Sequence, residues 1–227
     1  MHLTPDQNVL WKWGFLEINA TIVFTWSVIL LLTGMSWLLT RGLTASDQHR
    51  SRWQSGLEAV VEMIRRQIRE ICPTYSDTYL RFAGTLFLFI AVSNALDVVP
   101  GWQAPTGSLS TTAALAICVG IAVPAFGIVR QGLGGYLRHY IRPSWIILPF
   151  HLMSETTRNL ALAVRLFGNI MSGTMIVGIL LAIAPLFVPV LMQALGLLVG
   201  LIQAYIFAVL SMVYIAAAVR RDQEGAK

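Results

Sequence analysis

An apolar stretch of the chain, residues 144–180, carries polar and charged side chains at helical spacing. On an α-helix these side chains fall within an arc of about 100° and form one stripe: His151, Ser154, Glu155, Arg158, Arg165, Asn169 and Ser172. A guanidinium stays charged even when it is buried, because its pKa exceeds about 12. Such a charge inside a membrane segment must face water, an acid or a partner, so the stripe is a candidate for ion chemistry.

The two arginines of this stripe differ in the partners that the sequence offers them. Arg158 follows Glu155 by one helical turn on the same face, so a purely structural ion pair is an open explanation for it. Arg165 has no acid within a turn on either side, and its apolar neighbours make an interfacial position a poor explanation. Asp97 is the only other acid near a membrane segment. The sequence therefore favours a carboxylate on another polypeptide as the partner of Arg165.

A second polar stripe runs along the apolar stretch 186–219. Its members fall within an arc of about 80° on a helix: Gln193, Gly196, Gly200, Gln203, Ser211 and Tyr214. Small residues let helices approach closely, so ordinary helix packing is an open explanation for the glycines. The amide of Gln203 needs hydrogen-bond partners in an apolar setting, which favours a polar surrounding.

The composition places these stripes in a membrane protein. The 227 residues are 56% hydrophobic and only 12% charged, and the mean hydropathy is +0.68. Soluble domains carry about 25% charged residues. The net charge of +5 is divided among short segments between apolar runs, so we expect no nucleic-acid partner. The two cysteines have no metal-ligand or disulfide spacing, and we expect no metal site and no cofactor.

The apolar runs predict an all-α polytopic fold with about five membrane helices, since a span needs roughly 20 residues. We expect an external N-terminal segment, residues 1–18, and one membrane domain, residues 19–227. The expected spans are residues 19–40, 79–98, 110–129, 144–180 and 186–219. The last two would be about 50–55 Å long at 1.5 Å per residue, against about 30 Å of hydrocarbon. Either they form a strongly tilted hairpin or parts of them lie outside the membrane.

Two polar segments connect these spans. Residues 51–71 repeat apolar side chains at helical spacing, with arginines mainly on the other face, which predicts an amphipathic helix on the bilayer surface. A helix packed on a partner protein is the alternative. Residues 130–142 are basic and rich in glycine, and we expect a connecting loop there.

The distribution of basic residues predicts the orientation. Of 16 Lys and Arg, six lie in residues 41–69, three in residues 130–142 and three after Val219. Basic loops stay on the cytoplasmic side. We therefore expect the N-terminus outside and the C-terminus inside a bacterial inner membrane.

Several motifs in the expected spans resemble those of subunit a of rotary F-type ATP synthases. Arg165-Leu-Phe-Gly-Asn169, followed by Gly173, is similar to the signature of that family. So is Gln203-Ala-Tyr-Ile-Phe on the next span. Upstream, Asn94-Ala-Leu-Asp97-Val-Val-Pro100 resembles the end of the family's second span. Pro105-Thr106, with Leu109 and Thr112, resembles the start of the helix that follows. The matches cover residues 80–219 in the family's order.

The resemblance implies a non-catalytic stator subunit that passes protons or sodium ions through two half-channels against a ring of c subunits. It also implies peripheral-stalk b subunits and the F1 sector as partners within the complex. Arg165 matches the stator arginine, and Asn169 and Gln203 match polar positions around it. Asn94 and Asp97 match outer-channel positions. Glu155, with Arg158 beside it, aligns with an acid that some members carry at the inner side.

The chain departs from many bacterial members at three positions. Thr174, Gly196 and Ser108 occupy positions where those members have a glutamate, a histidine and a further acid. The resemblance therefore leaves Asp97 as the main outer acid, and it leaves open whether water replaces a side-chain relay or the ion is sodium.

A different class of protein is the main alternative on the residues alone, since an intramembrane enzyme lacks a recognisable catalytic motif here. A secondary transporter could use a polar site between the last two helices, although two related halves, which are typical of that class, are not evident.

Overall fold

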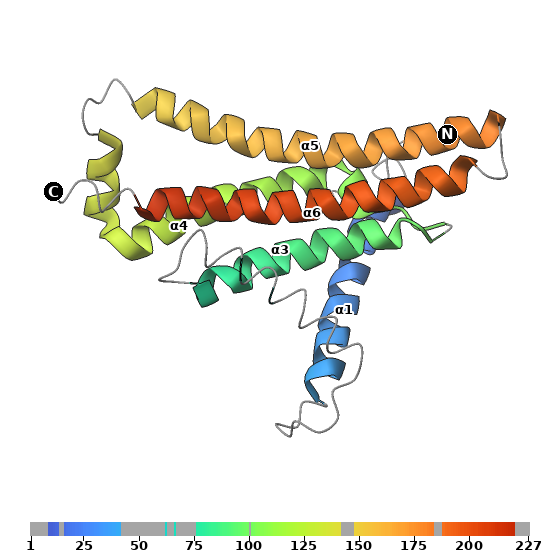
Figure 1. The fold of residues 1–227 in the computed structure, drawn as a ribbon, viewed down its shortest axis with the longest axis horizontal. Helices are drawn as coiled ribbons and strands as arrows, with labels where there is room; N and C mark the ends of the chain where they lie inside the picture. The colour runs from blue at the N-terminus through green and yellow to red at the C-terminus, as the bar shows by residue number, and fades with distance from the viewer. Residues whose placement is uncertain are drawn as a thin grey trace.

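Long helices make up most of the chain that the computed structural model describes (Figure 1), which is residues 9–13, 16–41, 62, 66, 76–99, 101–141, 148–183 and 188–220. In chain order they are α1 (Ala20–Arg41), α3 (Ser76–Leu96), α4 (Leu109–Ile141), α5 (Leu148–Ile183) and α6 (Val188–Arg220). Four of these helices contain an apolar stretch long enough to cross a membrane, and the apolar stretch of α3, Arg81–Leu96, is shorter. The predicted all-α polytopic membrane fold is confirmed for this part of the chain.

Helix α1 shows how an apolar helix accommodates polar side chains. The hydroxyls of Thr25, Ser27 and Thr33 each donate to the carbonyl four residues earlier in the same helix, at 2.7, 2.8 and 2.8 Å. Hydrocarbon offers no partner to a polar group, so bonds within the helix are the available solution. The rest of α1 can then present an apolar surface.

Helices α3, α4, α5 and α6 pack into one bundle (Figure 1), in which α5 and α6 run side by side over their length and α3 lies along α6. Their buried apolar side chains form a single core: Ala83, Leu86, Ile90, Ala91, Val119, Val123, Leu162, Leu166, Ala204, Phe207, Met212, Ile215 and Ala216. Phe82 of α3 and Phe126 of α4 close one side of this core with ring centroids 6.0 Å apart. The 36 and 33 residues of α5 and α6 agree with the two long segments that the sequence predicts.

Helix α1 extends away from this bundle at a steep angle (Figure 1). Its contacts are with α3, with the strand β2 and with η3, a 3-10 turn at Pro105–Gly107. Trp26, Leu30 and Leu38 are 63%, 66% and 66% exposed. α1 therefore contributes little to the core and leaves most of its apolar surface for lipid or another chain.

The expectation of a loop over residues 130–142 is wrong. Helix α4 continues to Ile141 and changes direction at Gly132, whose φ and ψ are 72° and 160°. This backbone region is essentially restricted to glycine. The glycines of the segment therefore mark a break between two helical pieces, where the sequence predicted a stretch without helix.

The N-terminal region contains a two-stranded antiparallel sheet that the sequence did not predict. Strands β1 (Val9–Trp13) and β2 (Leu16–Asn19) pair Trp13 with Leu16 and Lys12 with Glu17, and β2 leads directly into α1. The predicted interfacial helix at residues 51–71 lies outside the described residues except for Glu62 and Arg66, which are both helical.

Candidate functional site

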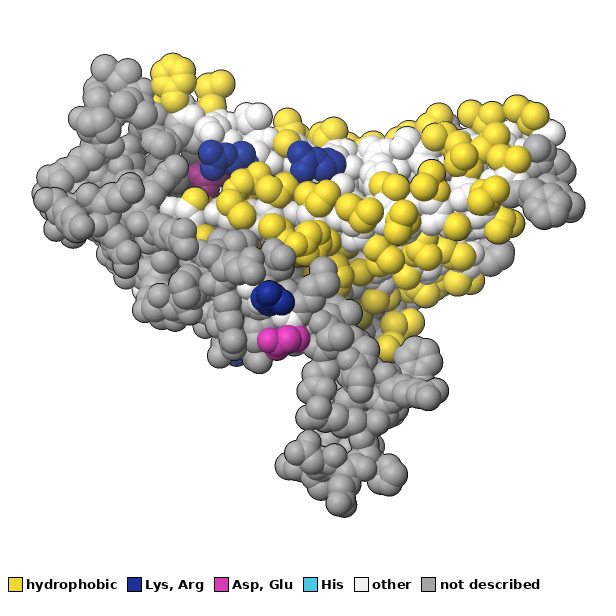
Figure 2. Space-filling view, viewed as in Figure 1, with side chains coloured by type: hydrophobic (Ala, Val, Ile, Leu, Met, Phe, Trp, Pro, Cys, Tyr) yellow, Lys and Arg dark blue, Asp and Glu magenta, His cyan; other side chains and the backbone are white. Residues whose placement is uncertain are grey.

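Helix α5 presents Arg158 and Arg165 on its exposed surface, beside the face that packs into the core. That buried face carries Leu162 and Leu166, at 1% and 0% exposure. Because each residue turns the helix by about 100°, the two arginines border the buried face. Exposed apolar side chains precede Arg165 on α5, including Leu160 and Val164, at 61% and 52% exposure. Figure 2 shows basic side chains over α5 within this largely apolar surface.

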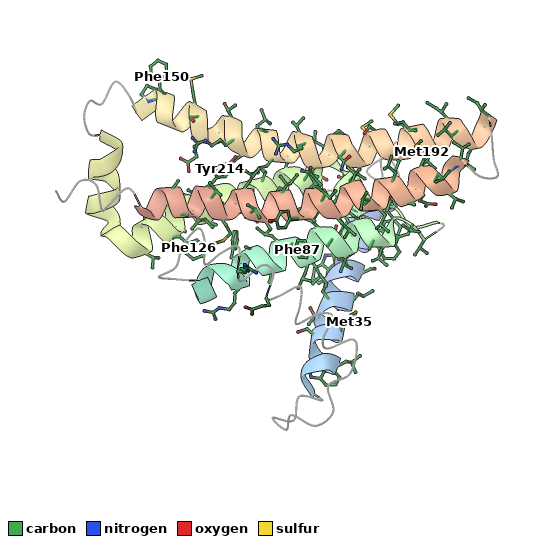
Figure 3. The ribbon with its side chains drawn as sticks, viewed as in Figure 1. Met35, Phe87, Phe126, Phe150, Met192 and Tyr214 are labelled. Carbon is green, nitrogen blue, oxygen red and sulfur yellow. The ribbon has the colours of Figure 1, made fainter. Side chains whose placement is uncertain are left out.

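Arg158 contacts an aromatic residue of α6. Its guanidinium carbon lies 5.4 Å from the ring centroid of Tyr214, within the range of a cation–π contact. Tyr214 projects from α6 toward α5 (Figure 3). The predicted pairing of Arg158 with Glu155, which is half-buried, stays a prediction. The structure shows Tyr214, on the neighbouring helix, as a contact of Arg158. This contact connects α5 with α6.

Arg165 forms no ion pair with any carboxylate of the described residues. A guanidinium keeps its charge in any surrounding. An exposed, permanent charge among apolar side chains in the middle of a 36-residue helix is unfavourable in lipid. The expectation that its partner lies on another polypeptide stays a prediction.

A cavity of about 320 Å³ lies where the end of α3 meets α5 and α6. Its polar walls come from four parts of the chain: the end of α3, the segment before η3, the middle of α5 and the start of α6. The polar side chains are Asn94, Asp97, Gln103, Asn169, Thr174 and Gln193. Met192, which lies near the start of α6 (Figure 3), closes part of the wall.

Asp97 occupies the turn directly after α3 and borders this cavity. One oxygen of its carboxyl accepts a hydrogen bond from the backbone N–H of Ala104 at 3.1 Å. The side-chain amide of Gln193 lies 3.4 Å from the carbonyl oxygens of Asp97 and Val98. Burial raises the pKa of the Asp97 carboxyl, and the hydrogen bond from Ala104 opposes part of this shift. The carboxyl therefore takes up its charge at a higher pH than an exposed aspartate.

Asn94 joins three elements beside the same cavity. Its amide nitrogen donates to the carbonyl of Gly200 in α6 at 2.9 Å. Its amide oxygen accepts from the hydroxyl of Thr106 in η3 at 2.7 Å. Asn94 is only 2% exposed, so both ends of the amide are bonded within the protein.

The predicted site residues thus fall into two groups. Asn94, Asp97 and Asn169 border the cavity, whereas the other four lie away from it: Glu155, Arg158, Arg165 and Gln203. Asn169 connects the groups, because four residues of helix separate it from Arg165 by about 6 Å along the axis of α5. Gln203 is buried in α6, and its amide nitrogen has no hydrogen-bond partner in the described part of the chain.

The three positions at which the chain departs from its apparent family differ in their surroundings. Thr174 and Gly196 both border the cavity. The hydroxyl of Thr174 bonds to the backbone of its own helix, at Ile170 and Met171. Ser108 is buried and lies 2.6 Å from the hydroxyl of Ser110. A Cβ added at Gly196 would meet nothing within 4 Å, so the cavity has open space at that position.

Three residues of this region were named in the sequence patterns but were not among the predicted site residues. Gln193 and Tyr214 belong to the polar stripe of α6, and that stripe was a usable signal for both. Thr106 has no periodic signal, because it lies in a short turn. Its importance appears only when the turn is seen to pack on Asn94.

In the described part of the chain, four helices long and apolar enough to cross a membrane, with a polar cavity among the packed helices, define a polytopic membrane protein. The family model described as ATP synthase A chain matches residues 22–216. "ATP synthase subunit a 2" of Acaryochloris marina is 60% identical over 98% of this chain and 95% of its own length. "ATP synthase subunit a 1" of Chlorobaculum parvum is 60% identical over 99% of both chains. "ATP synthase subunit a" of Albidiferax ferrireducens is 58% identical over 97% of this chain and 95% of its own.

The chain therefore belongs to the family of subunit a of the F-type ATP synthase. This membership connects it with ATP synthesis, with ion transport and with a membrane.

Proposed function

We propose that this chain is the stationary ion-conducting subunit of a rotary ATP synthase, and that Arg165 is its central residue. The exposed position of Arg165, with no ion pair to a carboxylate in the described residues, is the observation that carries this proposal. The partner of Arg165 in this proposal is a carboxylate on each c subunit of a rotating ring. The subunit itself makes and breaks no covalent bond, and its task is to control where ions enter and leave the ring.

Arg165 acts by electrostatic attraction. Opposite charges 4 Å apart attract by about 4 kcal/mol at an effective dielectric constant of 20. This attraction favours the ionised form of an arriving carboxylate, which then releases its proton or sodium ion. The same positive charge repels cations and so prevents a direct leak between the two sides. The pairing must also break at each step of rotation, so very tight binding would be harmful.

The cavity beside Asp97 is the outer half-channel of this proposal. Its volume of about 320 Å³ exceeds the roughly 30 Å³ that one water molecule occupies in the liquid. Its polar walls provide hydrogen-bond partners for several waters. Asn169 borders the cavity one helical turn from Arg165, so water at the inner end of the cavity would lie near the arginine.

Water replaces a side-chain relay in this half-channel. Thr174 bonds to its own helix, and Gly196 has no side chain, so neither supplies an ionisable group. Asp97 is then the principal acid of the cavity and attracts cations to its mouth. Both protons and sodium ions could use a path of this kind.

The remaining assignments follow from the same arrangement. Glu155 and Arg158 lie toward the cytoplasmic end of α5 and belong to the inner half-channel, and Gln203 supports Arg165 from α6. Peripheral-stalk b subunits and the F1 sector complete the complex. The complex lies in a bacterial inner membrane with the N-terminus of this chain outside and its C-terminus in the cytoplasm.

Replacement of Arg165 tests the proposal. We expect Arg165→Ala to abolish ATP-driven ion pumping in membrane vesicles while subunit content stays normal, because a neutral side chain no longer forces the ring carboxylate to ionise. Arg165→Lys should also fail largely, since lysine lacks the planar fork of arginine and can lose its proton when buried.

Passive ion flux and subunit content are measured on the same vesicles. Arg158→Ala serves as the matched control, because it removes a charge from the same helix and is expected to have a milder effect. An Arg165→Ala complex that assembles and pumps at a near-normal rate would refute the proposal. If Arg158→Ala is instead the inactive variant, the roles of the two arginines must be exchanged.

A further inference from the structure

Asn94 borders the outer cavity, yet its amide is occupied by the protein. The nitrogen donates to the Gly200 carbonyl at 2.9 Å, and the oxygen accepts from Thr106 at 2.7 Å. With 2% of its surface exposed, Asn94 has little opportunity to contact a passing ion. Its geometry is that of a connection between α3, α6 and η3.

Thr106 has no access to the cavity at all. It is fully buried in η3, and it is absent from the cavity wall. Its side-chain hydroxyl donates to the oxygen of Asn94. A buried hydroxyl that loses its partner costs free energy, so this hydrogen bond holds the turn in one position.

The 3-10 turn transmits this position to Asp97. The N–H of Gly107 bonds to the carbonyl of Ala104 at 2.9 Å, which closes the turn around Thr106. The N–H of Ala104 in turn donates to the Asp97 carboxyl at 3.1 Å. A movement of Thr106 would therefore also move the group that holds the carboxyl.

Close packing leaves little room for such a movement. A methyl group added at Gly200 would lie 3.1 Å from the side chain of Asn94. One added at Gly107 would lie 3.3 Å from Ile170 of α5. Both distances are shorter than ordinary van der Waals separations. α5 thus packs against the turn, and α6 packs against the Asn94 side chain that bonds to the turn.

We propose that Asn94 and Thr106 are positioning residues that anchor the turn before α4 to α6 and thereby hold the Asp97 carboxyl on the wall of the cavity. This inference rests on the proposed role of the cavity as a half-channel. In this inference Asp97 is the residue that contacts the ions, and Asn94 acts indirectly by holding Asp97 in place. The family resemblance alone implies a direct place in the ion path for Asn94.

The test measures the initial rate of ATP-driven ion pumping by the complete complex in vesicles, with subunit content assayed on each sample. Thr106→Val removes the hydroxyl and should lower the rate about fivefold, the factor that corresponds to one ordinary hydrogen bond. Thr106→Ser keeps the hydroxyl and should restore most of the rate. In an Asp97→Asn background, Thr106→Val should add less than about a twofold loss, because the two changes act through the same carboxyl.

Three results would overturn the inference. An equal loss from Thr106→Val with and without Asp97 would show that Thr106 acts independently. An equally poor Thr106→Ser would exclude the hydroxyl as the cause. Normal pumping by Asp97→Asn would show that the Asp97 carboxyl is not needed, and the inference would then be wrong. The stator mechanism is tested independently, by Arg165→Ala.

A second variant covers the case in which Thr106→Val does not assemble. Gly200→Ala crowds Asn94 and should reproduce the loss of pumping. Gly84→Ala, on the same helix as Asn94, meets nothing within 4 Å and is the matched control. If neither Thr106→Val nor Gly200→Ala assembles, the link serves the stability of the fold, and the inference is wrong.

Discussion

The charged residues of this subunit differ mainly in how the protein surrounds them. A guanidinium such as that of Arg165 stays charged in any surrounding. The surroundings of Arg165 therefore determine which groups it can pair with. Asp97 can change its charge, and burial on the wall of the cavity favours its neutral form. Arg158 contacts the ring of Tyr214 and so has a partner within the chain. Arg165 forms no ion pair with a carboxylate in the described part of the chain, and we expect its partner on a second protein.

The raised pKa of Asp97 predicts a pH dependence. Burial favours the neutral acid, so Asp97 should lose its charge, as the pH falls, at a value above the ordinary 3.8. We expect ATP-driven pumping to decline on the acidic side with a midpoint above that value. Asp97→Asn should slow pumping at neutral pH without loss of assembly, and it should remove this acidic decline.

The measurement is the rate of pumping against external pH for both forms, corrected for ATP hydrolysis by the F1 sector. Glu62→Gln is a suitable control, since Glu62 is an exposed acid remote in sequence from the cavity. An unchanged pH profile in Asp97→Asn would mean that Asp97 is only a solvated acid at the end of a helix.

Among the helices, α4 shows how one residue changes the course of an element. Pro124 lies within the helix without ending it, although a proline removes one backbone hydrogen bond. Gly132 does change the direction, because its φ of 72° lies outside the helical range. The second piece of α4, beyond Gly132, turns sharply across the end of the bundle (Figure 1).

Gly132→Ala is therefore expected to destabilise the subunit. A side chain at this φ and ψ costs of the order of 1–3 kcal/mol, and the alternative, a straight α4, would displace the second piece. The amount of subunit in assembled complex should fall after mild heating or detergent exposure. Gly34→Ala in α1 is the control, since it meets nothing within 4 Å and has an ordinary helical φ. Equal behaviour of the two variants would contradict this explanation of the break.

Considered as a whole, the molecule has large apolar surfaces that it does not cover by itself. Only 11% of the membrane-spanning stretches of α1 and α5 is buried within the chain. Lipid can cover the apolar part of these surfaces, but its hydrocarbon offers no partner to Arg165. The chain is thus expected to require other subunits for a stable arrangement in the membrane.

The predicted orientation can be tested with single cysteines. The native Cys118 is exposed, so Cys118 and Cys72 are first replaced by alanine. A cysteine at Gly101, which is exposed in the segment after α3, should react with a membrane-impermeant reagent from outside the cell. A cysteine at the C-terminal Lys227 should react only in inverted vesicles. Labelling of both sites from the same side would show the orientation to be wrong.

The sequence by itself determined the class of fold and the residues at the centre of the proposed mechanism. A run of about 20 apolar residues indicates a membrane-spanning helix, because the core of a soluble protein does not need an apolar run of that length. Helical periodicity depends only on neighbours along the chain, so the stripes of α5 and α6 were visible without a structure. The same local reasoning failed at residues 130–142, where glycines indicated a loop and the backbone forms two helical pieces.

Only the tertiary structure decided which polar residues act together. Gly200 is far from Asn94 and Thr106 in the sequence, and the connection of the three depends on how α3, η3 and α6 pack. The cavity that unites Asp97 with Asn169 and Gln193 is likewise a product of that packing. Hydrogen bonds and cavities depend on distances between elements, and periodicity along one element contains no information about those distances.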